Sequence, residues 1–477
     1  KGGIGKIMRK VAIIGAGSIV FCKTLMLDIM ATNGLEDTTF ALMAPSERNI
    51  SKVNDFAKRV IHENGLPTKV YTTTNSREAL KGADFVISTF QVGGVKAFEF
   101  DWKIPKKYGV DQCIGDTLGP GGVFRALRSI PVILDLAKNM EELCPKALLL
   151  NYVNPMAMVC WALGETKVKL VGLCHGVQTT LDLISGYVGV PKEEIDYICA
   201  GINHMAWFLK LERNGQDLYP ILKDKFEQPE YYVNEKVRGE VLRQFGYFMT
   251  ESTGHLSEYV PWFRKNQKSL DIYCDEPDFG GESGAYYKWC AHVADKYSQK
   301  DVLSDEPTKL PPRSIEYGSY IIEAIEKRKP FKFNGNIRND GMITNLPNDC
   351  CAEGPIYADE NGLHKTIIGD LPPQCAALNM TNINVQRLAV LAAKNGDPEA
   401  VVQACAMDPL TGAVLNLNEI REMVSEMLEA EKQWLPQFEG KTIRKTPLIH
   451  IPKNVQRAKV PVDPALAIIH RFGKLAE

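Results

Sequence analysis

Arg9-Lys10-Val11-Ala12-Ile13-Ile14-Gly15-Ala16-Gly17-Ser18 is the stretch of sequence that decides the fold. Its apolar run predicts a buried strand of a parallel sheet, because such strands are covered on both faces. Apolar residues at helical spacing follow from Val20 to Met30. A strand, a glycine turn and a helix in direct succession form the context of a dinucleotide-binding fingerprint. The stretch therefore predicts the βα unit that opens a Rossmann-like domain.

The two glycines of this turn have separate roles in such a fingerprint. Gly15 allows the tight turn, and Gly17 lets the backbone approach a pyrophosphate at the free N–H groups of the helix start. Val20 occupies the position of the usual third glycine. A purely structural turn therefore remains an alternative when this motif is taken alone.

Further strands are predicted along the first two hundred residues, and helical patterns lie between them. They cover residues 38–43, 84–90, 147–153 and 170–173. This alternation indicates an α/β fold with a doubly wound, mostly parallel sheet. After about residue 200, long helical patterns and aromatic segments take over. We therefore predict an NAD-binding Rossmann-like domain over residues 8–200. A mixed α+β domain over residues 201–477 would carry substrate, metal and oligomer contacts.

Composition excludes several classes of protein. The 477 residues include 56 basic and 58 acidic side chains, so no electrostatic footprint for nucleic acid or an anionic membrane is present. No apolar run approaches the ~18 residues that span a bilayer. The 12 cysteines follow no secretory signal, which predicts mostly buried free thiols in a cytoplasmic protein. We interpret residues 1–7 as leftover expression sequence before a natural start at Met8.

Four polar segments differ from ordinary core sequence, and two of them directly follow predicted strands. They are Ile114-Gly115-Asp116-Thr117-Leu118-Gly119-Pro120-Gly121-Gly122, Asn151-Tyr152-Val153-Asn154-Pro155, Gly172-Leu173-Cys174-His175-Gly176 and Gly201-Ile202-Asn203-His204. Open α/β sheets bind ligands at the carboxyl ends of their strands. Cys174 and His204 offer a thiolate and an imidazole, which suit a divalent transition metal and leave positions open for substrate. An ordinary buried cysteine remains the alternative for Cys174 alone.

The end of the second strand bears on the choice of cofactor. Ala44 stands where an acidic residue would bind the ribose 2′-hydroxyl, and Glu47 could replace it. Ser46 and Arg48 could instead accept a 2′-phosphate, so NAD is favoured and NADP stays open. The predicted cofactor contacts are Gly15, Gly17, Ser18, Ile19, Ser46, Glu47, Thr89, Gln91, Asn151 and Val153.

Together these motifs resemble glycoside hydrolase family 4, the NAD- and divalent-metal-dependent glycosidases. The resemblance runs over nearly the whole chain. It includes the later stretches Ser257-Glu258-Tyr259-Val260-Pro261-Trp262, Asn336-Ile337-Arg338-Asn339-Asp340-Gly341 and Thr381-Asn382-Ile383-Asn384-Val385-Gln386. It implies NAD and Mn²⁺, or another divalent transition metal, as cofactors.

The resemblance also implies a reaction in which oxidation, elimination, addition and reduction follow one another on the sugar. NAD would take hydride from C3, a base would remove the C2 proton, and the metal would stabilise the enolate. The aglycone would then leave C1, water would add, and hydride would return.

The same resemblance implies roles for residues of this chain. Cys174 and His204 would hold the metal, while Asn154, Asn203 and Arg338 would bind substrate. His175 would protonate the leaving oxygen, Glu258 or Tyr259 would be the C2 base, and Asp116 would act as an acid or a hydroxyl contact.

The predicted substrate is an α-D-glucuronide. Cys174-His175-Gly176 resembles the α-glucuronidase-like members, and glycine at position 176 would leave room for a larger C6 substituent. Candidate partners for the uronate carboxylate are Arg338, Lys265, Arg264 and Arg238. An α-galactoside and an α-galacturonide are the alternatives.

Two other classes of protein stay open, a malate- or lactate-type dehydrogenase and an NAD-sensing binding protein. A homodimer or homotetramer is expected, because closed symmetric assemblies are the common form of such enzymes.

Overall fold

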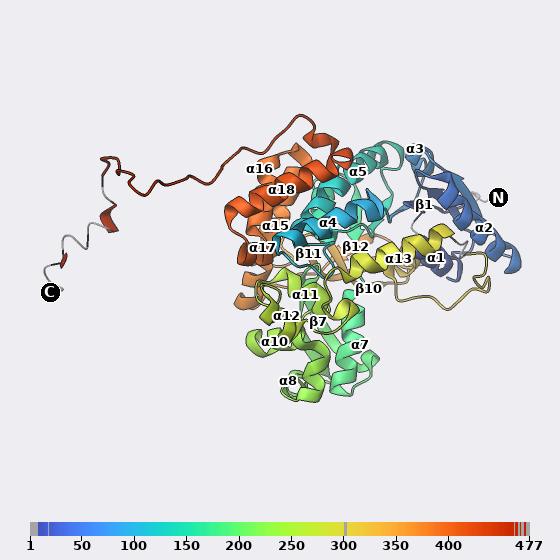
Figure 1. The fold of residues 1–477 in the computed structure, drawn as a ribbon. Coiled ribbons are helices and arrows are strands. Elements are labelled where there is room, and N and C mark those ends of the chain that lie inside the picture. Colours follow the sequence, from blue (N-terminus) through green and yellow to red (C-terminus); the bar gives the residue numbers. More distant parts are fainter. Residues whose placement is uncertain are drawn as a thin grey trace. The chain divides into compact units, whose positions relative to one another are not determined.

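The computed structural model describes residues 8–17, 19–299, 303–461, 463–465, 468 and 472–473. The segment predicted to be leftover sequence, residues 1–7, lies outside this part. The chain divides into two units, Lys1–Ile443 and Arg444–Glu477. Residues 444–461 of the second unit contain no helix or strand. All of the labelled elements belong to the first unit (Figure 1).

The first six strands form a parallel sheet, which confirms the predicted fold class. In spatial order they are β3 (Lys69–Thr73), β2 (Thr39–Met43), β1 (Lys10–Ile14), β4 (Phe85–Ser88), β5 (Leu148–Asn151) and β6 (Lys169–Gly172). This is the order of the doubly wound dinucleotide-binding fold, which reverses between β1 and β4. The sequence did not predict β3, because this edge strand is not fully buried at any of its five positions.

Helices between these strands complete the βα units and bury the sheet. They are α1 (Ile19–Met30), α2 (Glu47–Glu63), α3 (Ser76–Leu80), α4 (Gly94–Tyr108), α5 (Gly119–Leu143), α6 (Met156–Leu163) and α7 (Gly176–Val188). Val11, Ala12 and Ile13 of β1 have no exposed surface, which explains the unbroken apolar run in the sequence.

The second half of the sheet is antiparallel. It continues from β6 through β10 (Phe331–Arg338), β11 (Cys351–Asp359), β7 (Asp196–Ile202), β8 (Met205–Arg213) and β9 (Gln216–Asp217), with β12 (Gly362–Lys365) beside β11. Within the described residues, all twelve strands belong to one sheet. Because the sheet continues through residue 200, the domain boundary expected there stays a prediction.

Two joints in this half of the sheet each consist of a single residue pair. Gly172 of β6 pairs with Asn336 of β10, and Gly201 of β7 pairs with Glu353 of β11. Both joints lie beside segments that the sequence marked as functional. The sheet therefore brings the carboxyl end of β6 and the turn after β7 to neighbouring positions.

Helices from the carboxyl-terminal half cover this part of the sheet. They are α8 (Tyr219–Phe226), α9 (Pro229–Tyr232), α10 (Lys236–Phe245), α11 (Thr253–Tyr259), α12 (Gln267–Tyr273), α13 (Ala285–Gln299), α14 (Tyr317–Lys327), α15 (Pro373–Asn395), α16 (Pro398–Met407), α17 (Pro409–Val414) and α18 (Leu417–Glu431). Helix α15 packs against α5, α6 and α16, so the two halves share one core.

The cysteines and the helices of the described residues bear on two expectations from the sequence. Ten cysteines are buried, Cys174 and Cys290 are half-buried, and all twelve are free thiols, as predicted. Among the described residues, no helix combines the length and the apolar character that crossing a membrane requires. The oligomeric state and the cytoplasmic location stay predictions.

Candidate metal centre and active site

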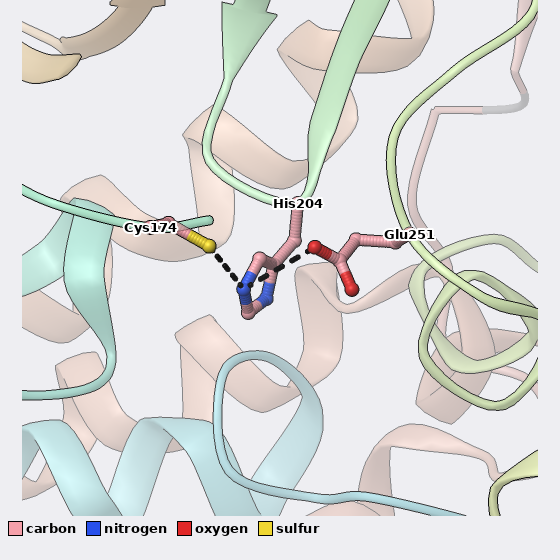
Figure 2. Close-up of side chains that lie close together, drawn as sticks. All are labelled: Cys174, His204 and Glu251. Atoms are coloured by element: carbon pink, nitrogen blue, oxygen red, sulfur yellow. Dashed lines mark hydrogen bonds and ion pairs between the residues drawn. The ribbon is translucent and has the colours of Figure 1, made fainter. Parts of the chain in front are cut away.

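Three side chains with metal-binding atoms meet at the carboxyl edge of the sheet. Cys174 follows β6, His204 lies in the turn between β7 and β8, and Glu251 precedes α11 (Figure 2). Nε2 of His204 is 3.6 Å from Sγ of Cys174 and 3.6 Å from Oε1 of Glu251. The three ligand atoms all lie within 4.8 Å of one another. The structure thus brings the predicted pair together and adds Glu251, to which sequence reasoning gave no role.

The backbone around His204 is specialised for this position. Asn203 and His204 form the two-residue turn, and His204 adopts a left-handed φ of 63°. A Cβ on Gly201 would lie 2.5 Å from the carbonyl oxygen of Met205, so only glycine permits this close hairpin. The turn holds the imidazole over the end of β6, where Cys174 lies.

Hydrogen bonding fixes the orientation of the His204 ring. Nδ1 lies 3.0 Å from the hydroxyl oxygen of Tyr259, while Nε2 faces Cys174 and Glu251. Burial lowers the pKa of His204, which favours the neutral ring. In the tautomer in which Nδ1–H donates a hydrogen bond to the hydroxyl oxygen of Tyr259, the lone pair of Nε2 is free to bind a metal.

Charge in this cluster fits a cation. Burial, followed by the charge of Glu251, raises the pKa of the Cys174 thiol well above its usual value. A divalent cation would reverse this effect and favour the thiolate, because metal binding releases the proton. The thiol, imidazole and carboxylate together form a donor set for a divalent transition metal.

A chain of polar contacts connects this cluster to Asp116 and Asn154, two of the predicted site residues. Nδ1 of His255 lies 3.2 Å from Oε2 of Glu251, and its Nε2 lies 4.0 Å from Oδ1 of Asp116. Asn154 Nδ2 donates to Asp116 Oδ2 over 3.1 Å. Burial alone would raise the pKa of Asp116, but Arg125 and the nearby histidines lower it. Asp116 is therefore an ionised hydrogen-bond acceptor near the cluster of Cys174, His204 and Glu251.

The two candidates for the C2 base have different surroundings. Glu258 accepts three backbone hydrogen bonds, from Cys113 (2.7 Å), Ile114 (3.0 Å) and Gly115 (2.8 Å). Burial outweighs these bonds and raises the pKa of Glu258 to about 7. Both of its oxygens are used to hold the loop before Asp116. Tyr259, which contacts the ring of His204, is the better placed of the two candidates.

His175 lies next to the cluster at the start of α7. Its Nδ1 is 3.1 Å from Oε1 of Glu316, and this hydrogen bond raises the pKa of His175. The side chain is 46% exposed, so it can still reach a bound molecule. Sequence reasoning did not identify Glu316, because it lies about 140 residues further along the chain.

Of the two other residues predicted to bind substrate, Asn203 lies beside the cluster and Arg338 does not. Asn203 Nδ2 donates to Glu353 Oε2 over 3.2 Å, and burial raises the pKa of Glu353 to about 7. Arg338 pairs instead with Asp340 at 2.9 Å. Because β10 runs antiparallel to β6 and Asn336 pairs with Gly172, Arg338 lies further toward the amino end of β6. The structure does not bring Arg338 into the cluster.

The space beside Gly176 is already filled. A Cβ on Gly176 would lie 2.7 Å from Oε1 of Glu251 and 3.6 Å from Sγ of Cys174. The expectation that glycine at this position leaves room for a larger sugar is therefore wrong, since the carboxylate of Glu251 occupies that room.

Arg125 is a further buried residue that the sequence did not reveal. Its Nη1 lies 3.9 Å from Oδ2 of Asp116, and the guanidinium lies over the ring of Phe98. Within the described residues, Nε and Nη1 of Arg125 donate no hydrogen bond. A buried cation with free donors beside Asp116 is suited to bind a polar group of a ligand.

The predicted dinucleotide turn has the expected close packing. Gly15 has a φ of 98°, and a Cβ there would lie 2.6 Å from the backbone nitrogen of Phe90. Thr89 Oγ1 donates to the carbonyl oxygen of Gly15 over 3.1 Å. The turn thus lies directly against the end of β4, at the position where such folds bind a pyrophosphate. Gly17 is half-buried, Ile19 begins α1, and Ser18 lies outside the described residues.

The remaining predicted cofactor residues lie along the same edge. Ser46 and Glu47 are exposed at the start of α2, and Gln91 Nε2 donates to the carbonyl oxygen of Gly94 over 3.4 Å. The side chain of Asn151 is fully buried and bonds to Ser88 and to the backbone of Val153. Asn151 therefore shapes its own loop, and Val153 is buried beside it.

The fold and this cluster define a Rossmann-type α/β protein with a candidate metal centre at the carboxyl edge of its sheet. A family model described as Family 4 glycosyl hydrolase matches residues 10–190, and one for the C-terminal domain of that family matches residues 199–411. The chain belongs to the family 4 glycosyl hydrolases.

Several relatives carry more specific names. The chain is 42% identical over 441 residues to an α-galactosidase of Rhizobium meliloti, covering 90% of this chain and 89% of that protein. It is 39% identical over 441 residues to an α-galactosidase of Bacillus subtilis, covering 90% and 100%. An α-galacturonidase of Lachnoclostridium phytofermentans is 29% identical over 455 residues, covering 90% and 97%.

A solved structure shares the fold. The 6-phospho-α-glucosidase from gut microorganisms, in complex with NAD and Mn²⁺, superimposes with a TM-score of 0.71 at 21% identity and covers 90% of this chain and 99% of that one.

Proposed function

We propose that this chain hydrolyses α-galactosides with the help of NAD and a divalent metal such as Mn²⁺, by oxidation, elimination, addition and reduction. The observation that carries the proposal is the Cys174–His204–Glu251 cluster at the carboxyl edge of a dinucleotide-type sheet. Glycosidases that use a pair of carboxylates need neither a metal-binding cluster nor a dinucleotide-type sheet. The α-galactosidases of R. meliloti and B. subtilis, at 42% and 39% identity, support the choice of sugar.

The residues present fit both cofactors. Gly15 and Gly17 lie where a pyrophosphate would meet the start of α1, and the bare Cα of Gly15 permits the close turn. NAD, when bound, would accept hydride from C3 and return it, so that no net oxidation results. Cys174 and His204 would hold the metal, which would supply Lewis-acid stabilisation of negative charge on the sugar oxygens.

Residues of the chain would move the protons. Tyr259, positioned by Nδ1 of His204, would take the proton from C2 as the tyrosinate. Burial raises the pKa of its hydroxyl well above the usual value, and a divalent cation held beside His204 would favour the deprotonated form. Asp116 and Asn154 would hydrogen-bond the sugar hydroxyls and fix the ring. His175, whose pKa is raised by Glu316, would hold a proton and give it to the leaving oxygen.

A galactoside suits this site better than the predicted glucuronide. The larger C6 substituent of a uronide would need free space at Gly176, and the carboxylate of Glu251 fills that space. Three arginines considered as partners for its carboxylate already pair with acidic residues. They are Arg264 with Asp111 (3.0 Å), Arg238 with Glu235 (2.6 Å) and Arg338 with Asp340 (2.9 Å).

An α-galacturonide is the second candidate, and Arg125 is the observation that favours it. The buried guanidinium lies 3.9 Å from Asp116, yet its Nε and Nη1 donate no hydrogen bond in the described part of the chain, so a C6 carboxylate could bind there. The α-galacturonidase of L. phytofermentans is a relative at 29% identity.

The test compares nitrophenyl α-galactoside, α-galacturonide and α-glucuronide, each with NAD and Mn²⁺ and after both are removed. We expect the galactoside to be hydrolysed fastest and only with both cofactors. Cys174→Ser should abolish this activity and keep the melting temperature, whereas Cys144→Ser, at the far end of α5, should retain activity. Full hydrolysis without NAD and metal would refute the proposal.

A further inference from the structure

Gly176 and Glu251 lie on different segments, yet their geometry is coupled. Glu251 precedes α11, and Gly176 is the first residue of α7. We propose that Glu251 is a third protein ligand of the divalent metal and that glycine at position 176 is what gives its carboxylate room. This inference rests on the metal dependence in the proposed function and adds the residue pair that completes the site.

Distances support a ligand role for Glu251. Its Oε1 and Sγ of Cys174 lie on either side of Nε2 of His204, and the dashed lines in Figure 2 converge on that nitrogen. Ligand bonds of about 2.0–2.3 Å place two donors of one ion roughly 3–4 Å apart. The separation of 3.6 Å from Nε2 to each neighbour matches that spacing and exceeds a normal hydrogen bond between Nε2 and a carboxylate.

The second oxygen of Glu251 is held in place. His255 contacts Oε2 at 3.2 Å, which orients the carboxylate so that Oε1 faces the cluster. The side chain is 10% exposed, so little of it faces solvent. Metal-binding carboxylates are commonly oriented by a hydrogen-bond partner of this kind. A carboxylate also adds the oxygen donor that Mn²⁺ prefers over sulfur.

A side chain at position 176 would overlap with one neighbour, the carboxylate of Glu251. A Cβ at this position would lie 2.7 Å from Oε1 of Glu251, although the φ of Gly176 is outside the left-handed region. The backbone would therefore accept alanine at position 176. The conflict is with the carboxylate alone, so a side chain at position 176 and the observed position of Glu251 exclude each other.

This geometry gives a test by pairs of variants. The metal-free protein is titrated with Mn²⁺, and free Mn²⁺ is followed by electron paramagnetic resonance. We expect Glu251→Ala and Glu251→Gln each to raise the Kd for Mn²⁺ at least 10-fold. Gly176→Ala should also raise it, because the new methyl group displaces Oε1. Gly186→Ala, in the same helix and with no atom within 4 Å of the added Cβ, should bind like the wild type.

The double variant provides the sharpest result. If Gly176 acts through the carboxylate, Gly176→Ala should cause no further loss in a protein that already carries Glu251→Ala. Equal and additive losses would overturn the coupling, and a wild-type Kd in both Glu251 variants would overturn the ligand role. Melting temperatures identify any variant that fails to fold, and the isosteric Glu251→Gln then decides.

A second readout separates this inference from the proposed function. Co²⁺ bound to a cysteine thiolate gives a charge-transfer band, while its visible bands follow the set of ligands. In Glu251→Ala, the thiolate band should persist and the visible bands should change. A wild-type protein that binds neither Mn²⁺ nor Co²⁺ would refute the proposed function itself, whereas normal metal binding that ignores Glu251 refutes only this inference.

Discussion

Gly15→Ala tests whether the turn after β1 is a cofactor cradle. The added Cβ would lie 2.6 Å from the nitrogen and 2.9 Å from the Cα of Phe90, and 2.8 Å from the carbonyl carbon of Thr89. These are backbone atoms, and the N–H of Thr89 donates to the carbonyl oxygen of Ile14 over 2.8 Å, so the neighbours cannot rotate away. A left-handed φ costs alanine about 1–2 kcal/mol and the overlap about 1–3 kcal/mol. The free energy of unfolding should therefore fall by about 2–5 kcal/mol.

Displacement of the turn would relieve part of this strain and move the backbone that faces the pyrophosphate. A shift of roughly 1 Å can cost ~100-fold in a positioned interaction, so we expect the Kd for NAD to rise by at least 10-fold. Isothermal titration measures this Kd, and urea unfolding measures stability. Gly109→Ala is the matched control, because Gly109 has the same φ of 98° and its Cβ would meet only Val414 Cγ1 at 3.6 Å. Gly109→Ala should bind NAD like the wild type. If Gly15→Ala does so too, the turn is not the cofactor cradle.

Three further variants test other parts of the molecule. Tyr259→Phe should lower kcat by roughly 10²–10⁴-fold without changing the melting temperature, and an unchanged kcat would exclude Tyr259 as the base. Arg128→Ala should lower the free energy of unfolding by about 3–5 kcal/mol in urea, because it leaves the fully buried carboxylates of Asp101 and Glu431 without their cation. Burial raises the pKa of Glu353 from 4.5 to about 7, so the folded protein binds more protons than the unfolded chain between these values. The free energy of unfolding of the wild type should therefore fall by about 3 kcal/mol as the pH rises through that range. Glu353→Gln should be the more stable protein at pH 8 and should lose this advantage at pH 4.

Much of the fold could be predicted because its signals are local. The apolar run of β1, the glycine turn and the helical spacing of α1 lie within about twenty residues, and each has one physical interpretation. The strand order of the antiparallel half could not be predicted from local signals. Its strand order depends on which of several short segments pair, and two of the joints consist of one residue pair each.

The site followed the same division between local and distant signals. Cys174 and His204 could be identified because each lies two residues after the end of a strand and within a polar motif that the sequence makes visible. Glu251 and His255 could not be identified, because no predicted strand ends at their segment and their contacts form only with neighbours that folding supplies. Arg338 lies outside the cluster although its motif is prominent in the sequence, because β10 runs antiparallel to β6 and carries position 338 away from the edge where the cluster lies. Its role in binding substrate stays a prediction.

The glycine of Cys174-His175-Gly176 shows why a substrate cannot be inferred from a short motif alone. A missing side chain was interpreted as room for the sugar, which assumes that nothing else in the chain fills the space. The structure fills it with the carboxylate of Glu251, 2.7 Å from where a Cβ would be, although 75 residues separate the two positions in the chain. In the proposed metal site, a residue at position 176 would act first on the carboxylate of Glu251 and only through it on the sugar. Changes of substrate among variants at this position should therefore be accompanied by changes in metal affinity.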